Sequence, residues 1–371
     1  MADTVYFPSP GDPWEHRAPE QLGLDGEQLA AAAQFSFEHE TPWSTDVRTT
    51  LTENNRAEGP YGAIIGPVAP RGGVSGVVLR HGYVAASWGY PARVDMTFSA
   101  SKSYLATLAG LALDRGLIRS IDDPVREYVD DGGFDPPHNS TITWRHLLNQ
   151  TSEWTGTLWD KPDSVDHNRG VGDVNWGSVA KGVERQLHEP GTFWEYNDVR
   201  VNRLALALLR VWGRALPDVF KESVMGPIGA SGTWVWYGYE NSYVTINGQR
   251  VQSVSGGGHW GGGVQVSTWD HARFGYLHLR RGRWKDRQLL SEQWIETALT
   301  PIATNPSYGC LWWLNTSRIR FPSAPESSFY AIGAGTNIIW IDPDHDLVAV
   351  VRWIDSNAVD GFMAQVLAAI R

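Results

Sequence analysis

Residues 96–117 read MTFSASKSYLATLAGLALDRGL and carry the clearest structural signal in the chain. The segment begins with small polar residues, continues with leucine and alanine at helical spacing, and ends at Gly116. Small polar residues favour helix N-termini, and glycine is common just beyond a helix C-terminus. The pattern therefore predicts a capped and buried helix.

Ser99 and Lys102 lie three residues apart at the start of this helix, so their side chains share the face where backbone N–H groups point outward. A buried lysine can lose its proton because desolvation disfavours the ammonium, and it can then accept the hydroxyl proton of a serine that attacks a carbonyl. The spacing thus predicts Ser99 as nucleophile and Lys102 as its activator. The alternative is that Ser99 only caps the helix and Lys102 is solvated, since S-x-x-K alone also occurs by chance.

The overall composition is that of a folded protein with a large core. The chain has 371 residues, of which 42% are hydrophobic and 19% charged, so two or three structural units are expected. Its net charge of -10 gives no attraction for nucleic acid or for an anionic membrane. The expected partner is a small molecule, and no signal for an oligomeric state is visible.

Several classes of protein are disfavoured by what the sequence lacks. Cys310 is the only cysteine, so an intramolecular disulfide and a cysteine-based zinc site are excluded. The eleven histidines show no metal-ligand spacing, and neither a metal nor a cofactor is expected. The first residues do not resemble an export signal, and no apolar run could span a bilayer, which together predict a cytoplasmic protein.

The two ends of the chain resemble each other in pattern. Residues 72–89 and 337–353 each show two β-branched runs around a turn, and residues 26–40 and 359–371 have helical patterns. These features predict an α+β fold in which an antiparallel sheet flanked by helices is built from both ends. We expect a discontinuous sheet domain at 1–120 and 250–371, a mostly helical insertion at 121–249, and a cleft between them.

Three blocks of sequence resemble the serine β-lactamase, DD-peptidase and esterase superfamily. SASKSYLATLAGLALDRGLIRSIDDPVREYV (99–129) resembles its nucleophile helix and the continuation of that helix. TWRHLLNQTSEW (143–154) resembles its T-x-x-H-L-L-x-x-T-S-G block, with Glu153 in place of the usual glycine. GTFWEYNDVRVNRLALALL (191–209) resembles the block that carries a second catalytic element. The resemblance implies a β-lactamase/transpeptidase-like fold.

By this resemblance Tyr196 relays the proton between Ser99, Lys102 and the leaving group. The family's usual asparagine two positions later is Asp198 here. A carboxylate near Lys102 attracts the ammonium form, which shifts more of the base role onto Tyr196. The alternative for Tyr196 is simple packing among its aromatic neighbours.

The K-T-G motif of β-lactamases and peptidases is absent from the chain. Instead, SFYAIGAGTNIIWIDPDHDLVAVV (328–351) resembles a strand of the esterase and 6-aminohexanoate-oligomer hydrolase branch. The resemblance implies that the backbone N–H groups of Ser99 and Ala334 form an oxyanion hole, and that Gly333 lets the substrate approach the strand. The alternative is that these glycines only form a turn or a bulge.

Residues 255–275, SGGGHWGGGVQVSTWDHARFG, resemble a glycine-rich family loop that enters a helix near Thr268. We expect His259 and Trp260 to border the cleft, although a loop without a catalytic part is the alternative. Trp154 and Trp313 lie in blocks next to the family's cleft and are expected to wall an apolar pocket, with core packing as the alternative. Asp198 completes the set of expected substrate-binding residues.

These observations predict a serine hydrolase that cleaves a carboxylic ester or a neutral amide through an acyl-Ser99 intermediate. The missing K-T-G lysine removes the usual anchor for a negatively charged acyl substrate such as a penicillin. An acyltransferase, or a β-lactamase or DD-peptidase, is the first alternative. A ligand-binding homologue without catalytic activity is the second.

Overall fold

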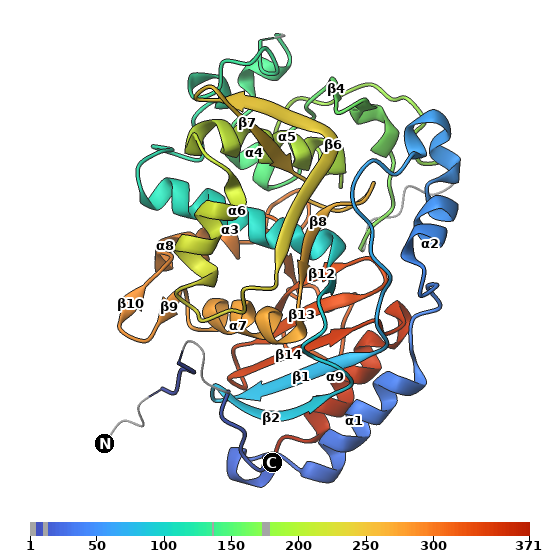
Figure 1. The fold of residues 1–371 in the computed structure, drawn as a ribbon, viewed down its shortest axis with the longest axis vertical. Helices are drawn as coiled ribbons and strands as arrows, with labels where there is room; N and C mark the ends of the chain where they lie inside the picture. Colours follow the sequence, from blue (N-terminus) through green and yellow to red (C-terminus); the bar gives the residue numbers. More distant parts are fainter. Residues whose placement is uncertain (1–4, 10–13, 136, 173–178) are drawn as a thin grey trace.

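The computed structural model describes residues 5–9, 14–135, 137–172 and 179–371. A six-stranded antiparallel sheet forms its lower half, and both ends of the chain contribute to it (Figure 1). In spatial order its strands are β11 (Trp313–Leu314), β12 (Phe329–Gly333), β13 (Asn337–Asp342), β14 (Leu347–Arg352), β1 (Ser75–Arg80) and β2 (Tyr83–Trp88). Because β1 pairs with β14, with Ser75 opposite Arg352, the two ends of the chain meet inside this sheet.

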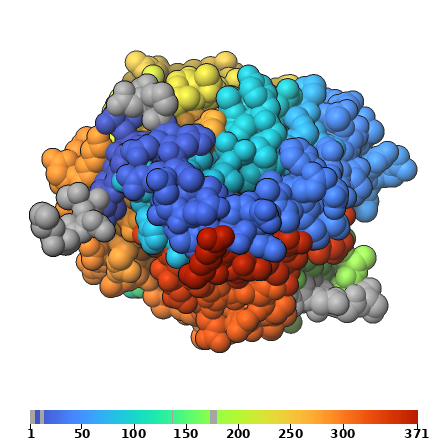
Figure 2. Space-filling view, turned by 90° about the horizontal axis from the view of Figure 1, so that it is seen from below, coloured from blue at the N-terminus to red at the C-terminus, as the bar shows by residue number. Residues whose placement is uncertain are grey.

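Helices cover both faces of the six-stranded sheet. Gly275 of α7 (Thr268–Leu279) lies against Ile339 and Val348 on one face. On the opposite face, Trp88 packs on Phe362 of α9 (Val359–Ala368). Helix α1 (Gly26–Glu38) packs against α9, so the N-terminal and C-terminal helices lie side by side (Figure 2). This arrangement confirms the predicted α+β fold, with its antiparallel sheet flanked by helices.

A second sheet has the order β3-β8-β6-β7 and lies above the first. Its strands are β3 (Asp95–Met96), β8 (Gly263–Val266), β6 (Val235–Ile246) and β7 (Gln249–Val254). The strand β6 lies within 121–249, the span where a mostly helical insertion was expected, and the sequence did not predict this strand. Its pairing with β7 shifts register between Gly238 and Tyr243, and this irregularity obscures the two-residue alternation by which a strand is recognised. The predicted domain boundaries stay a prediction.

The predicted buried helix is α3 (Ser101–Asp114), which packs against α5 (Asp198–Trp212). Its residues from 101 to 112 are all buried, which agrees with the leucine and alanine pattern. The N-cap is Ala100, and Ser99 lies in the 3-10 turn η3 (Phe98–Ala100) that precedes the helix. Ser99 is therefore not a capping residue.

The remaining elements are short. The helices among them are α2 (Val47–Asn54), α4 (Trp144–Leu148), α6 (Leu216–Phe220) and α8 (Glu292–Ala298), and the strands are β4 (Thr157–Leu158), β5 (Lys161–Pro162), β9 (Arg283–Trp284) and β10 (Arg287–Gln288). Within the described ranges, no helix combines the length and the apolar character needed to cross a membrane.

Arg352, which is completely buried at the end of β14, connects the two sheets. Its guanidinium donates to Asn337 Oδ1 at 2.7 Å in the first sheet. It also donates to three backbone carbonyls of the second sheet, those of Val266 at 2.5 Å, Asp95 at 3.0 Å and Met96 at 2.7 Å. These bonds join β14 of the first sheet to β3 and β8 of the second at a buried position.

We expect Arg352→Met to lower the free energy of unfolding by about 3–5 kcal/mol, because it removes the hydrogen bonds that a buried guanidinium makes to both sheets. Urea denaturation followed by tryptophan fluorescence measures the loss. Arg287→Met, at an exposed position of β10, is the matched control and is expected to change stability by less than about 0.5 kcal/mol. Equal stability of the two variants would contradict the bridging role of Arg352.

Candidate active site

Ser99 is presented by a strained turn that aromatic packing holds in place. The preceding residue, Phe98, has a φ of 49°, in the left-handed region that costs a non-glycine residue roughly 1–2 kcal/mol. Its ring packs edge-on against Trp43 at 5.3 Å and Trp353 at 6.4 Å between ring centroids. The half-buried Ser99 thereby has a fixed position directly before α3.

Lys102, from the first turn of α3, lies at the centre of the polar groups around Ser99. Its Nζ donates to Ser99 Oγ at 3.0 Å and forms an ion pair with Asp198 Oδ1 at 2.5 Å. The same Nζ lies 4.5 Å from the centroid of the Tyr196 ring, close enough for a cation–π interaction. The packing of α3 against α5 thus brings together three expected residues, Ser99, Lys102 and Tyr196.

Asp198 points directly at Lys102, a geometry that the sequence had left open. Its other oxygen forms an ion pair with Arg169 and lies 3.5 Å from Nδ1 of His259. Burial alone would raise the pKa of Asp198, but the charges of Lys102 and Arg169 and the hydrogen bond with His259 outweigh burial and hold the pKa well below its usual range. Asp198 is therefore an ionised carboxylate shared between several cations.

Gly257, from the glycine-rich loop, lies directly against this ion pair. A Cβ atom at this position would lie 1.9 Å from Asp198 Oδ1 and 2.5 Å from Lys102 Nζ. Only glycine therefore lets the loop cover the Lys102–Asp198 pair. The close approach explains a glycine at this position without any contact to substrate.

Behind the pair lies a second buried group of charges, formed by Glu58, Asp166, His259 and Lys181. One ligand atom from each of Glu58, Asp166 and His259 lies within 4.8 Å of the others, a spacing that a metal ion can use. However, Lys181 Nζ lies 2.5 Å from Glu58 Oε1 and 2.8 Å from Asp166 Oδ1. An ammonium group already binds both carboxylates, and the absence of a metal stays a prediction.

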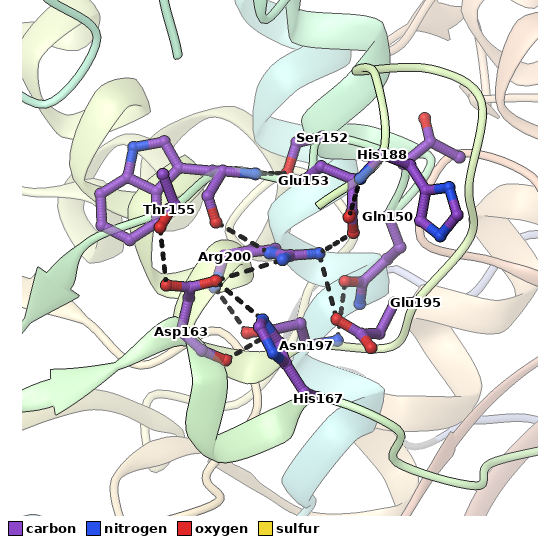
Figure 3. Close-up of polar contacts among 12 residues, drawn as sticks. Gln150, Ser152, Glu153, Thr155, Asp163, His167, His188, Glu195, Asn197 and Arg200 are labelled. Atoms are coloured by element: carbon purple, nitrogen blue, oxygen red, sulfur yellow. Dashed lines mark hydrogen bonds and ion pairs between the residues drawn. The ribbon is translucent and has the colours of Figure 1, made fainter. Parts of the chain in front are cut away.

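The presence of Glu153, at the position of the glycine in the T-x-x-H-L-L-x-x-T-S-G motif, has a structural explanation. Its φ is 48°, a left-handed conformation that glycine adopts without strain. The buried carboxylate forms an ion pair with Arg185 at 2.6 Å. It also pairs with Arg200 at 2.7 Å and accepts the backbone N–H of His188 at 2.9 Å (Figure 3). These charged contacts offset the strained backbone.

The network around Glu153 also fixes the turn that carries Tyr196 and Asp198. Gln150 Oε1 accepts the N–H of Asn197 at 3.1 Å (Figure 3). Asn197 in turn caps α5, because its Oδ1 accepts the N–H groups of the first helical turn at 3.1 and 3.2 Å. Tyr196 and Asp198 flank this cap, so the network sets the positions of both.

A cavity of about 390 Å³ opens at Ser99. Of the expected residues, Ser99, Tyr196, Trp313, Gly333 and Ala334 line it. Three further lining residues, Trp43, Arg169 and Arg320, belong to no recognisable motif and were not expected. Its volume is within the range of small-molecule sites, and its wall combines aromatic rings with two guanidinium groups.

Strand β12 runs very close to the turn that carries Ser99. A Cβ atom at Gly333 would lie 1.9 Å from the carbonyl oxygen of Thr97 and 3.0 Å from the backbone nitrogen of Ser99. Gly333 is thus required for contact between the strand and the nucleophile turn, rather than only for the approach of a substrate. The next residue, Ala334, is exposed and lines the same cavity as Ser99.

The structure places four of the expected substrate-binding residues away from the cavity wall. Trp154 is buried, and its Nε1 donates to the carbonyl of Gly133 at 2.8 Å. Trp260 is also buried, and its Nε1 donates to Glu58. His259 and Asp198 lie behind Lys102, because the glycine-rich loop folds over the ion pair instead of facing the cavity. A motif can place a segment near the cleft, but it does not show which of its side chains face the cleft.

Comparison with known proteins adds independent information. The Beta-lactamase family model matches residues 64–359. An uncharacterized protein of Alkalihalophilus pseudofirmus is 25% identical over 287 residues, which cover 71% of this chain and 74% of that protein.

Two solved structures show the same fold. A provisionally assigned 6-aminohexanoate-dimer hydrolase from Bacillus anthracis has a TM-score of 0.56 and 17% identity, with 79% of this chain and 77% of that chain covered. EstCE1, a hydrolase with promiscuous acyltransferase activity, has a TM-score of 0.57 and 17% identity, with 93% and 99% covered. The family model confirms the predicted resemblance to the β-lactamase-like superfamily. The two solved structures share the fold, and the assignment to the esterase and 6-aminohexanoate hydrolase branch stays a prediction.

The ion pairs of Glu153 make stability depend on pH. Burial alone would raise its pKa, but Arg185, Arg200 and the N–H of His188 lower it from 4.5 to about 2. A lowered carboxyl pKa stabilises the fold above pH 4.5 and loses this effect as the pH falls toward 2. We therefore expect Glu153→Gln to be destabilising at pH 7 by up to about 3 kcal/mol, with a smaller difference from wild type at lower pH.

Urea denaturation of both proteins between pH 3 and 7 measures this difference. Glu326→Gln, at an exposed position with no ion pair among the described residues, is the matched control and is expected to differ from wild type much less than Glu153→Gln at every pH value. A Glu153→Gln difference that does not change with pH would show that the ion pairs contribute nothing to folding.

Proposed function

The chain belongs to the Beta-lactamase family, and on that premise we propose that it is a serine hydrolase that cleaves a carboxylic ester or a neutral amide through an acyl-Ser99 intermediate. The observation that carries this proposal is the 3.0 Å contact between Ser99 Oγ and Lys102 Nζ at the wall of the cavity. A serine beside a lysine, open to a pocket of small-molecule size, is the arrangement that nucleophilic catalysis requires.

In the proposed first step, Ser99 Oγ attacks the carbonyl carbon of the substrate and loses its proton. Asp198 pairs with Lys102 at 2.5 Å and favours its ammonium form, so we assign to Lys102 the role of donating a hydrogen bond to Ser99 Oγ. Tyr196 then acts as the base that takes the proton from Ser99 and passes it to the leaving alcohol or amine. The bond to the leaving group breaks, and the acyl group remains on Ser99.

In the second step, a water molecule attacks the acyl carbon and Tyr196 takes a proton from that water. The bond between the acyl carbon and Ser99 Oγ then breaks, and Tyr196 passes the proton to Ser99 Oγ as the acid leaves. The backbone N–H groups of Ser99 and Ala334 are the proposed donors to the oxyanion in both steps. The close contact of β12 with the Ser99 turn at Gly333 supports this pairing, because it keeps the two backbones adjacent.

The apolar part of the cavity wall supports an ester or a neutral amide as the group that is cleaved. Trp43, Trp313 and Ile332 provide apolar surface next to Ser99. The similarity to EstCE1, whose description includes promiscuous acyltransferase activity, favours acyl transfer to an alcohol as a second reaction of the same intermediate. A ligand-binding protein without activity is less well supported, because it would not need Ser99, Lys102 and Tyr196 together.

We expect Ser99→Ala to lower kcat/KM for 4-nitrophenyl butyrate by about 10³-fold or more, because no acyl-enzyme can form. Wild-type protein is expected to gain the mass of a fluorophosphonate adduct on Ser99, measured by intact-protein and peptide mass spectrometry.

Ser103→Ala is the matched control, since Ser103 is buried on the same helix and donates to the carbonyl of Leu311 at 2.8 Å. It is expected to keep both the activity and the adduct. Full activity of Ser99→Ala, together with no adduct on wild type, would refute the proposed mechanism.

We expect Tyr196→Phe to lower kcat by about 10²–10⁴-fold while the adduct on Ser99 forms more slowly, because a proton relay is lost. Tyr308→Phe provides the comparison. Its buried ring lies 6.4 Å from that of Tyr196, and Tyr308 does not line the cavity. A similar loss in both variants would indicate that the hydroxyl of Tyr196 has only a packing role.

A further inference from the structure

Arg320 occupies an unusual position in the cavity that opens at Ser99. It belongs to the loop between β11 and β12 and lines the cavity together with Ser99 and Trp313. Its guanidinium carbon lies 5.5 Å from the ring centroid of Trp313, 5.3 Å from that of Phe321 and 5.9 Å from that of Tyr330. Three aromatic rings thus surround the group and limit its contact with water.

Among the residues that the structure describes, no carboxylate forms an ion pair with Arg320, and its Nη1 is buried without a hydrogen-bond partner. The other guanidinium on the cavity wall, that of Arg169, is paired with both Asp166 and Asp198. A buried charged nitrogen without a partner is costly, and an incoming anion would offset that cost. Arg320 has the features of a binding group that awaits its ligand.

We propose that Arg320 binds a carboxylate group of the substrate. The planar guanidinium presents parallel N–H groups that match the two oxygens of a carboxylate. A doubly charged phosphate fits less well, because Arg320 offers a single unpaired positive charge and the cavity also contains Asp355. The proposal rests on the proposed function and narrows its substrates to esters or amides with a carboxylate on one arm.

The path from Ser99 to Arg320 defines the shape of such a substrate. The Trp313 ring stacks on that of Tyr196, with 5.8 Å between centroids and 28° between planes, and the Arg320 guanidinium lies 5.5 Å from the centroid of the same Trp313 ring. Tyr196 lies over Lys102 and therefore next to the reacting serine. The carboxylate is thus separated from the scissile carbonyl by an apolar spacer that lies along Trp313. Although the K-T-G lysine is absent, Arg320 provides a cation in the cavity.

Two pairs of substrates test the proposal and locate the carboxylate. Mono-4-nitrophenyl suberate and its neutral carboxamide differ only on the acyl arm, whereas 4-carboxyphenyl butyrate and 4-carbamoylphenyl butyrate differ only on the leaving group. In wild type, kcat/KM is expected to favour the carboxylate in one pair. Arg320→Gln is expected to lower kcat/KM for that carboxylate by about 10–100-fold and to leave the neutral member unchanged.

Two further variants test whether the preference depends on the charge of Arg320, on the shape of its guanidinium or on the structure of its loop. Arg320→Lys keeps the charge without the planar fork and is expected to retain only part of the preference. Arg318→Gln removes a charge from the same loop at an exposed position, where Arg318 donates to the carbonyl of Pro322, and it is expected to keep the full preference. An equal loss in Arg318→Gln and Arg320→Gln would overturn the proposal.

Calorimetric titration with 4-hydroxybenzoate and with suberate distinguishes failure of this proposal from failure of the proposed function. Binding of either to wild type and its loss in Arg320→Gln support the carboxylate site even if no ester is cleaved. Hydrolysis of the neutral esters without any carboxylate preference or carboxylate binding overturns the site and leaves the proposed function standing.

Discussion

The ion pair between Lys102 and Asp198 is the interaction on which the arrangement of this site depends. Both side chains are almost completely buried, at 2% and 1% exposed, so neither charge can be stabilised by water. Removing one partner would leave an uncompensated charge in the interior, which is strongly destabilising. Because Lys102 lies in the first turn of α3 and Asp198 begins α5, the pair also fixes the two helix ends that carry the reacting groups.

The surroundings of the pair follow from the need to balance charge. Asp198 also binds Arg169, which contacts Asp166, and Asp166 binds Lys181. Acidic and basic groups therefore alternate along this series, and each of these charges has an opposite neighbour. The loop that covers these charges lies so close to the Lys102–Asp198 pair that a side chain would not fit there. The residue of the loop at this point is Gly257.

The parts of the structure that the sequence predicted are those encoded locally. The hairpins and the buried helix follow from residue periodicity over short segments, and Ser99 and Lys102 are neighbours because one helical turn separates them. Ala334 was expected from a family motif, without any knowledge of its distance from Ser99. The charged neighbours of Asp198 come from separate loops, and no local pattern places them together. The irregular strand β6 was missed because its register shift interrupts the alternation of side chains.

The position of β12 beside the Ser99 turn bears on why the positive group of the cavity, Arg320, lies outside this strand. Strand β12 lies so close to the Ser99 turn that a Cβ atom at Gly333 would clash with Thr97, and its cavity-lining neighbour Ile332 is apolar. A cation that serves this cavity must therefore come from a neighbouring segment. Arg169 is already neutralised by Asp166 and Asp198, since its role is to balance the buried acids. Arg320 has no such acid beside it among the described residues, and the aromatic rings around it keep its charge available to a ligand rather than to solvent.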